Sequence, residues 1–206
     1  MNKCLLILAG ILIAGMLCAA TDTSALYTRL QATYGELETF QAGLIQTNYY
    51  PQLKKTITYK GKIHFMPGRM LMSFTEPGVQ RLKVEDGRVE LYDASSNTLF
   101  ITDVQPEFGR MNPVEILQLY WSKSSVTVSS EDKTTASVKL VPAKDDLVNI
   151  LSATLNKGSG IISELSYTDK SGNKVTYNFS AIRLDEEIPS SVWDYDYPDD
   201  VQVVEQ

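Results

Sequence analysis

Apolar and polar residues alternate with a period of two through much of residues 40–101, and this pattern constrains the fold more than any other feature of the sequence. Within residues 57–65, apolar residues or glycine occupy the odd positions and polar residues the even ones. A half-buried strand has this period, because successive side chains point to opposite faces of its sheet. Asp86-Gly87 lies between two such stretches and favours a two-residue hairpin turn. We therefore expect a meander of short antiparallel strands.

Residues 23–40 follow the period of a helix instead. Thr23 or Ser24 is expected to cap its start, since a short hydroxyl side chain there accepts a hydrogen bond from a free backbone N–H group. Apolar side chains then recur at helical spacing and form one stripe that would pack against a core. These are Leu26, Leu30, Tyr34 and Leu37.

A second helix is expected to begin at Pro113. Asn112 is a favourable N-cap, and Glu115 lies where its carboxylate completes a capping box. Alternating segments then resume, with a polar turn at residues 169–173. The order is helix, strands, helix, strands, without an internal boundary. We therefore expect one mainly β, α+β domain over residues 21–206, in which a curved antiparallel sheet packs against two or three helices.

Residues 1–20 have the parts of a secretory signal peptide. Lys3 supplies a positive charge, and residues 5–17 form an uncharged apolar run. That run is shorter than the about 20 residues that a membrane-spanning helix needs. Small residues follow, so we expect cleavage after Ala20 and export across the inner membrane to the periplasm. A rival interpretation, in which Cys18 becomes a lipid-modified N-terminus, fits less well because a bulky residue precedes it.

Composition and charge argue against several classes of function. The formal net charge is −6 and the chain has no basic tract, so nucleic acid is not an expected partner. Cys4 and Cys18, the two cysteines, lie in the predicted signal, which leaves the mature chain without a thiol for a disulfide or a zinc site. His64, the single histidine, is interpreted as a solvent-facing residue of a strand. We expect no catalytic residue, no metal site and no cofactor, and hence a protein that is not an enzyme.

Methionines gather at one place in the sequence. Met66, Met70 and Met72 lie on or beside one expected strand, next to Phe74. Methionine is flexible and polarizable, so it suits a surface that accepts varied apolar partners. Methionines also fill irregular gaps in ordinary cores. The spacing alone leaves both a lipid-binding sheet and a closed core open.

Several weak motifs, taken in order along the chain, resemble the LolA-like family of periplasmic outer-membrane lipoprotein carriers. Residues 40–46 are similar to the F-x-x-x-F-x-Q strand that follows the family's first helix, and Pro67 and Pro77 keep the spacing between two family prolines. The hairpin at residues 84–93 and the closing segment 182–198 are also similar to family segments. The ordered set covers most of the expected mature chain.

The resemblance implies an incomplete, strongly curved antiparallel β-barrel whose helices form a lid over its concave face. That face would hold the acyl chains of a lipoprotein, because each methylene costs about 0.8 kcal/mol to expose to water. The implied protein is a monomeric periplasmic chaperone that carries lipoproteins from an inner-membrane release complex to an outer-membrane acceptor. The expected ligand-binding residues of the cleft and lid are Leu26, Leu30, Phe40, Leu44, Met66, Met70, Met72, Phe74, Leu91, Ile116 and Leu119.

One position departs from the family pattern. The family's well-known carriers have a basic residue just before the first proline, where it bonds to the lid, and this chain has Met66 there. Arg69 is the remaining candidate for a lid contact, so either the lid is held differently or the cargo differs. Two alternatives stay open: a LolA-like lipid-sensing regulatory module that controls a membrane partner, and a carrier of another amphiphile such as a glycolipid.

Overall fold

The structure, a computed structural model, describes residues 22–103 and 113–206. The predicted signal peptide, residues 1–20, and the expected N-cap Asn112 lie outside the described residues. Within the described residues, neither α-helix has the length and hydropathy of a membrane span.

The described chain contains two α-helices, α1 (Thr23–Tyr34) and α2 (Pro113–Lys123), and twelve strands. The strands before α2 are β1 (Phe40–Tyr50), β2 (Lys55–Met66), β3 (Arg69–Glu76), β4 (Gln80–Glu85), β5 (Arg88–Asp93) and β6 (Thr98–Asp103). The strands after α2 are β7 (Ser124–Glu131), β8 (Thr135–Pro142), β9 (Val148–Asn156), β10 (Ile162–Asp169), β11 (Lys174–Leu184) and β12 (Gln202–Glu205). Short 3-10 helices are η1 (Pro51–Leu53) and η3 (Ser190–Val192).

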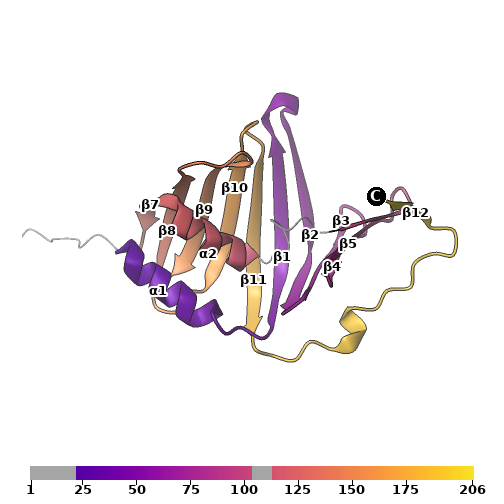
Figure 1. The fold of residues 1–206 in the computed structure, drawn as a ribbon, viewed down its shortest axis with the longest axis horizontal. Helices are drawn as coiled ribbons and strands as arrows, with labels where there is room; N and C mark the ends of the chain where they lie inside the picture. The colour runs from indigo at the N-terminus through magenta and orange to yellow at the C-terminus, as the bar shows by residue number, and fades with distance from the viewer. Residues whose placement is uncertain (1–21, 104–112) are drawn as a thin grey trace, which may run out of the picture.

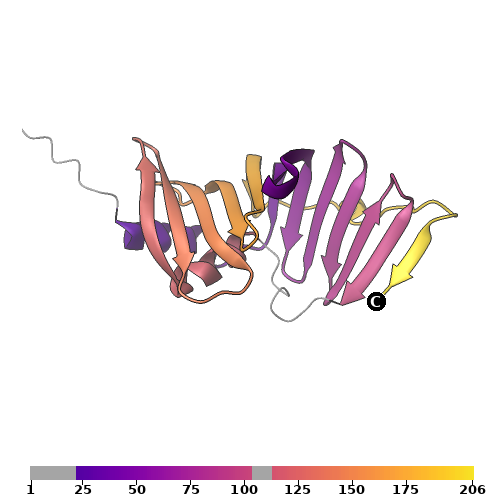
Figure 2. The same cartoon turned by 90° about the horizontal axis from the view of Figure 1, so that it is seen from above.

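All twelve strands form one sheet in the order β12-β6-β5-β4-β3-β2-β1-β11-β10-β9-β8-β7. Each pair of neighbours is antiparallel except β12 and β6, which are parallel. The sheet is curved and does not close, so β7 and β12 remain its two edges (Figures 1 and 2). The expected mainly β fold, an incomplete antiparallel barrel with helices on one face, is confirmed.

The first helix is shorter than the sequence predicted. Its N-cap is Asp22, whose carboxylate accepts the backbone N–H of Ser24 at 2.9 Å, rather than Thr23 or Ser24. The helix ends at Tyr34, because Gly35 follows and glycine is a poor helix former. The predicted helical range of 23–40 was therefore wrong at its end.

The hairpin between β4 and β5 has the turn that the sequence predicted. Asp86 and Gly87 both have positive φ, at 50° and 79°. A type I′ turn requires this backbone and matches the twist of the flanking strands. The turn pairs Glu85 with Arg88 and so sets the register of the whole hairpin.

Both helices pack on one face of the sheet, at the end formed by β7–β11, and we call this the inner face (Figure 1). The rings of Tyr27 on α1 and Trp121 on α2 stack with their centroids 5.3 Å apart. The Tyr34 hydroxyl accepts the backbone N–H of Ile162 at 3.1 Å, which fixes α1 to the start of β10. Gly160 approaches α1 so closely that a Cβ there would lie 2.6 Å from the backbone of Arg29.

A long C-terminal segment covers the opposite, outer face. Residues 185–201, which we call the strap, run from the end of β11 to β12 at the far edge of the sheet (Figure 1). The side-chain amide of Gln41 donates to the strap carbonyls of Glu186 and Glu187 at 3.0 and 3.2 Å. Trp193 of the strap is buried, with the guanidinium of Arg69 4.6 Å from its ring centroid. The sheet therefore has a helical layer on one face and an extended layer on the other.

Candidate functional site

The register of the sheet aligns apolar side chains on the inner face into rows that cross many strands. One row runs through Ala42, Ile63, Met72, Leu82, Leu91, Phe100 and Val204. A second row runs through Phe40, Phe65, Met70, Val84 and Val89. Each residue of a row is the direct partner of the next, so the face is apolar without interruption from β1 to β12 in the first row.

Most of the predicted cleft residues lie on this face or on the helices that cover it. Buried members of the same apolar cluster are Leu26, Leu30, Phe40, Leu44, Met70, Met72 and Phe74, with Ile116 packed against it. Leu91 lies on the inner face but is 38% exposed. Leu119 is 46% exposed on α2, whereas Leu117 of the same helix is fully buried in the cluster.

Within the described residues, the helices leave the apolar surface uncovered toward one edge of the sheet. Both helices lie at the β7–β11 end, so neither covers β4–β6 and β12 (Figures 1 and 2). There Leu82 is half-buried, while Phe100 and Val204 are 43% and 38% exposed. We call Leu82, Leu91, Phe100 and Val204 the apolar shelf. Side chains of this kind usually lie inside a protein, and a contiguous exposed group of them marks a surface that meets an apolar partner.

Three of the four shelf residues were not predicted from the sequence. Only Leu91 was predicted; Leu82, Phe100 and Val204 were not. The Asp86-Gly87 turn contained the signal for Leu82, because a two-residue hairpin places it opposite Leu91. The parallel pairing of β12 with β6, which aligns Val204 with Phe100, has no such local signal.

Met66 and Arg69 lie on the outer face, so their predicted places in the cleft and at the lid were wrong. They are partners in the β2–β3 register and alternate with the inward Phe65 and Met70. Arg69 forms an ion pair with Glu85. With its cation–π contact to Trp193, this places the guanidinium between the hairpin and the strap rather than at either helix.

Helix α2 is held by a different pair of residues. The Tyr120 hydroxyl donates to the Asp145 carboxylate at 2.8 Å, which ties α2 to the connection between β8 and β9. Asp145 also accepts the backbone N–H groups of Leu147 and Val148 at 2.8 and 2.6 Å. Burial, followed by the bond to Asp145, raises the pKa of Tyr120, so this hydroxyl stays a donor at neutral pH. The lid is therefore fastened without a basic residue at position 66.

His64 is buried, although the sequence suggested a solvent-facing residue. It is only 8% exposed, on the outer face beside Gln41, whose side-chain amide bonds to the strap. Burial lowers its pKa below the usual 6.5, and the positive charges of Lys62 and Arg183 lower it further. In the described part of the chain, no three His, Cys, Asp or Glu residues gather in a way that could hold a metal ion.

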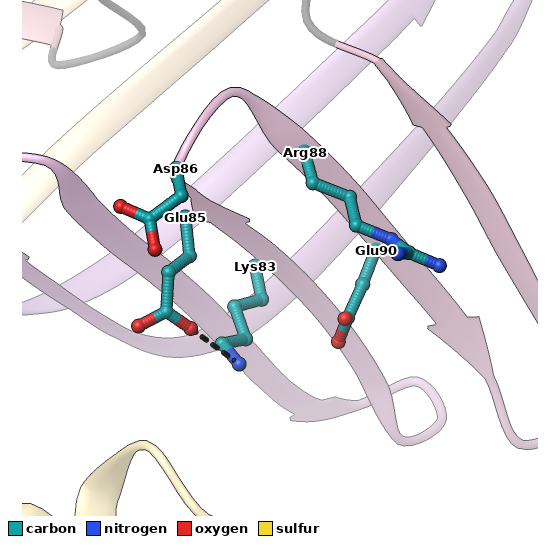
Figure 3. Close-up of a pocket in the computed structure, with 5 residues that line it drawn as sticks. All are labelled: Lys83, Glu85, Asp86, Arg88 and Glu90. Carbon is teal, nitrogen blue, oxygen red and sulfur yellow. Dashed lines mark ion pairs between the residues drawn. The ribbon is translucent and has the colours of Figure 1, made fainter.

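A small hollow on the outer side of the β4–β5 hairpin has the opposite character to the shelf. It encloses about 240 Å³ and is lined by Lys83, Glu85, Asp86, Arg88 and Glu90, all charged (Figure 3). The Lys83 ammonium and the Glu85 carboxylate are 2.7 Å apart, as the dashed line in Figure 3 marks. Because every side chain that lines it is charged, this hollow does not suit an acyl chain.

Residues 35–204 match the family described as outer membrane lipoprotein carrier protein LolA. The chain belongs to this family. The family that the sequence motifs suggested is thereby confirmed over most of the chain. A comparison with curated proteins found no match.

Solved structures with low sequence identity share the fold. An uncharacterized conserved protein from Thermus thermophilus superposes with a TM-score of 0.57 at 11% identity, covering 89% of this chain and 98% of that chain. MucB superposes with a TM-score of 0.52 at 12% identity, covering 90% of this chain and 66% of MucB. In the Pseudomonas aeruginosa MucA/MucB complex the TM-score is 0.50 at 12% identity, covering 85% of this chain and 62% of that chain. At such identities these similarities concern the fold alone.

Proposed function

We propose that this protein is a periplasmic chaperone that binds the acyl chains of lipoproteins on its inner face and carries them from the inner to the outer membrane. The observation that carries the proposal is the apolar shelf, which extends the buried cluster to an edge of the sheet that the described helices do not cover. Membership of the LolA family supports the same function.

The dimensions of the inner face suit an acyl chain. Neighbouring strands lie about 4.8 Å apart, so the row from Met72 on β3 to Val204 on β12 extends about 19 Å. That length is comparable with an extended long acyl chain. Each methylene that leaves water contributes about 0.8 kcal/mol, so a chain that covers the shelf gains several kcal/mol.

Reversible binding is as necessary as affinity, since a carrier must release its cargo. The half-exposed shelf, next to the buried but flexible side chain of Met72, buries an acyl chain without enclosing it completely. The helices are fastened at the other end of the sheet, so a chain can enter and leave along the β12 edge without unfolding α1 or α2. In this proposal the protein works as a monomer without cofactor or catalysis.

In the same proposal the predicted signal peptide directs the protein to the periplasm. There it receives lipoproteins from an inner-membrane release complex and passes them to an outer-membrane acceptor. Two other functions would use the same face: a lipid-sensing module that controls a membrane partner, and a carrier of another amphiphile such as a glycolipid.

Native mass spectrometry after incubation with a triacylated lipopeptide tests the proposal. We expect a one-to-one complex with the lipopeptide and none with the same peptide lacking its acyl chains. A complex that forms equally well with both peptides, or with neither, would contradict acyl-chain binding. Transfer of the bound lipopeptide to outer-membrane vesicles would separate a carrier from a sensor, which retains its ligand.

A further inference from the structure

A second hollow lies on the outer face, on the opposite side of the sheet from the proposed lipid surface. It encloses about 510 Å³ between β1, β2 and β11. Its walls include Gln41, Gly43, Lys62, His64 and residues 181–183. The strap begins beside it, where Gln41 bonds to the carbonyl of Glu186. Neither the proposed function nor family membership assigns a role to this hollow.

A β-bulge shapes one wall of the hollow. The register of β1 and β11 shifts between Gln41 and Gly43, so that β11 has an extra residue there. Ala181 in the bulge has a φ of +47°, a conformation that residues other than glycine rarely adopt. A Cβ on Gly43 would lie 2.6 Å from the Ser180 hydroxyl oxygen, so a larger residue here would require that hydroxyl to rotate away. Bulges and such backbone conformations concentrate at binding sites.

The charged side chains at the hollow are predominantly basic. Lys62 is exposed, and no carboxylate of the described residues lies within 4.0 Å of its ammonium. Arg183 donates to the side-chain oxygen of Gln41 at 2.9 Å and keeps further N–H groups available. Its ion pair with Glu186 is long at 3.7 Å and exposed to solvent.

His64 adds a buried polar atom that has no partner. Its Nδ1 is inaccessible to solvent and forms no hydrogen bond with the described residues. Nearly all buried polar atoms in proteins have a hydrogen-bond partner, and each exception calls for an explanation. Because Nδ1 is inaccessible to solvent as the ring lies here, the imidazole must turn toward the hollow before an oxygen of an anion attracted by Lys62 and Arg183 can bond to it.

We propose that this hollow binds a phosphate group, either free or in a lipid headgroup, with Lys62 and Arg183 holding its oxygens and the imidazole of His64 bonded to one of them. Lys62 and His64 belong to β2 and Arg183 to β11, so their donors approach the hollow from different directions. A phosphate can bond to all of them, because its oxygens also point in several directions. The volume exceeds that of the phosphate alone, which leaves room for the remainder of a headgroup.

His64 provides a direct readout, because it is the only histidine of the chain and its ring resonances in NMR spectra are unambiguous. The protein, prepared without a histidine tag, is titrated with inorganic phosphate at constant ionic strength. We expect a saturable shift of the ring resonances, with an affinity at least tenfold weaker in Lys62→Gln. Lys139→Gln removes an exposed lysine from the same face, on β8, and should leave the affinity unchanged.

Phosphatidylglycerol vesicles, applied to the same three proteins, identify the source of the phosphate. Cosedimentation that Lys62→Gln weakens and Lys139→Gln does not would assign a headgroup, whereas a saturable shift with inorganic phosphate alone would assign free phosphate. The proposal is wrong if inorganic phosphate produces no saturable shift and the vesicles do not cosediment with the protein, or if Lys62→Gln and Lys139→Gln respond equally.

Discussion

Leu82 and Leu91 face each other across the β4–β5 hairpin, with both side chains on the inner face of the sheet. The two-residue turn at Asp86-Gly87 sets this pairing, and a shift of β5 by one residue would send Leu91 to the outer face. Their position in turn aligns Phe100 of the next strand with them. A local turn thus determines where the uncovered apolar surface forms.

The turn itself can be tested by Gly87→Ala. Gly87 has a φ of +79°, which strains a residue with a Cβ, so we expect the free energy of unfolding to fall by about 1 kcal/mol. Urea denaturation measures the change. Gly78→Ala is the matched control, because a Cβ at Gly78 meets no atom within 4 Å and its φ is not positive. Equal effects of the two substitutions would contradict the turn's role.

The fastening of α2 predicts a local effect of Tyr120→Phe. Loss of the hydrogen bond to Asp145 should destabilise α2 by about 1 kcal/mol. Hydrogen exchange should therefore become faster in the amides of α2 than in those of α1. Tyr49→Phe, at an exposed tyrosine of β1, should change neither helix. Unchanged exchange in α2 would show that packing of Leu117 and Trp121 alone holds the helix.

Burial of His64 predicts that stability depends on pH. The folded protein lowers its pKa below 6.5, so the unfolded chain binds the proton more readily. The contribution of His64 to the free energy of unfolding is fully present well above pH 6.5. It is lost as the pH falls through 6.5 toward the lowered pKa of the folded state. In phosphate-free buffer, the loss of stability between pH 7.5 and 5.5 should be smaller in His64→Gln than in the wild type.

Urea midpoints at both pH values measure that difference, and NMR titration of the ring measures the pKa directly. A measured pKa at or above 6.5 in phosphate-free buffer would contradict the burial of His64.

The strap should be sensitive to Trp193. Truncation of this buried ring by Trp193→Ala should lower the free energy of unfolding by about 3 kcal/mol, because it opens a cavity over Arg69. Hydrogen exchange in β12 and β6 should rise as well, since the strap leads into their parallel pairing. Asp194→Ala, at the exposed neighbour, should have little effect on either measurement. An equal effect of both substitutions would argue against a packed strap.

Local signals predicted the strands and the hairpin, and contacts between distant segments account for the errors. The alternation of the sequence places His64 and Arg69 on one face of the sheet. It cannot reveal that the strap packs on that face, because the strap is far away in the sequence. Most positions of α2 are apolar, so tertiary packing decides that Leu117 is buried and Leu119 exposed. The same limit applies to the shelf, since the pairing that completes it joins β6 to the end of the chain.

The most direct test of lipid binding on the inner face compares Leu91→Asp with Leu53→Asp. Both leucines are exposed, but Leu91 belongs to the shelf and Leu53 lies in the 3-10 turn before β2. Affinity for a fluorescent triacylated lipopeptide should fall at least tenfold in Leu91→Asp, because a carboxylate there would lose its hydration beneath an acyl chain. It should not change in Leu53→Asp. Equal affinities of Leu91→Asp and the wild type, with both proteins folded, would contradict the central claim.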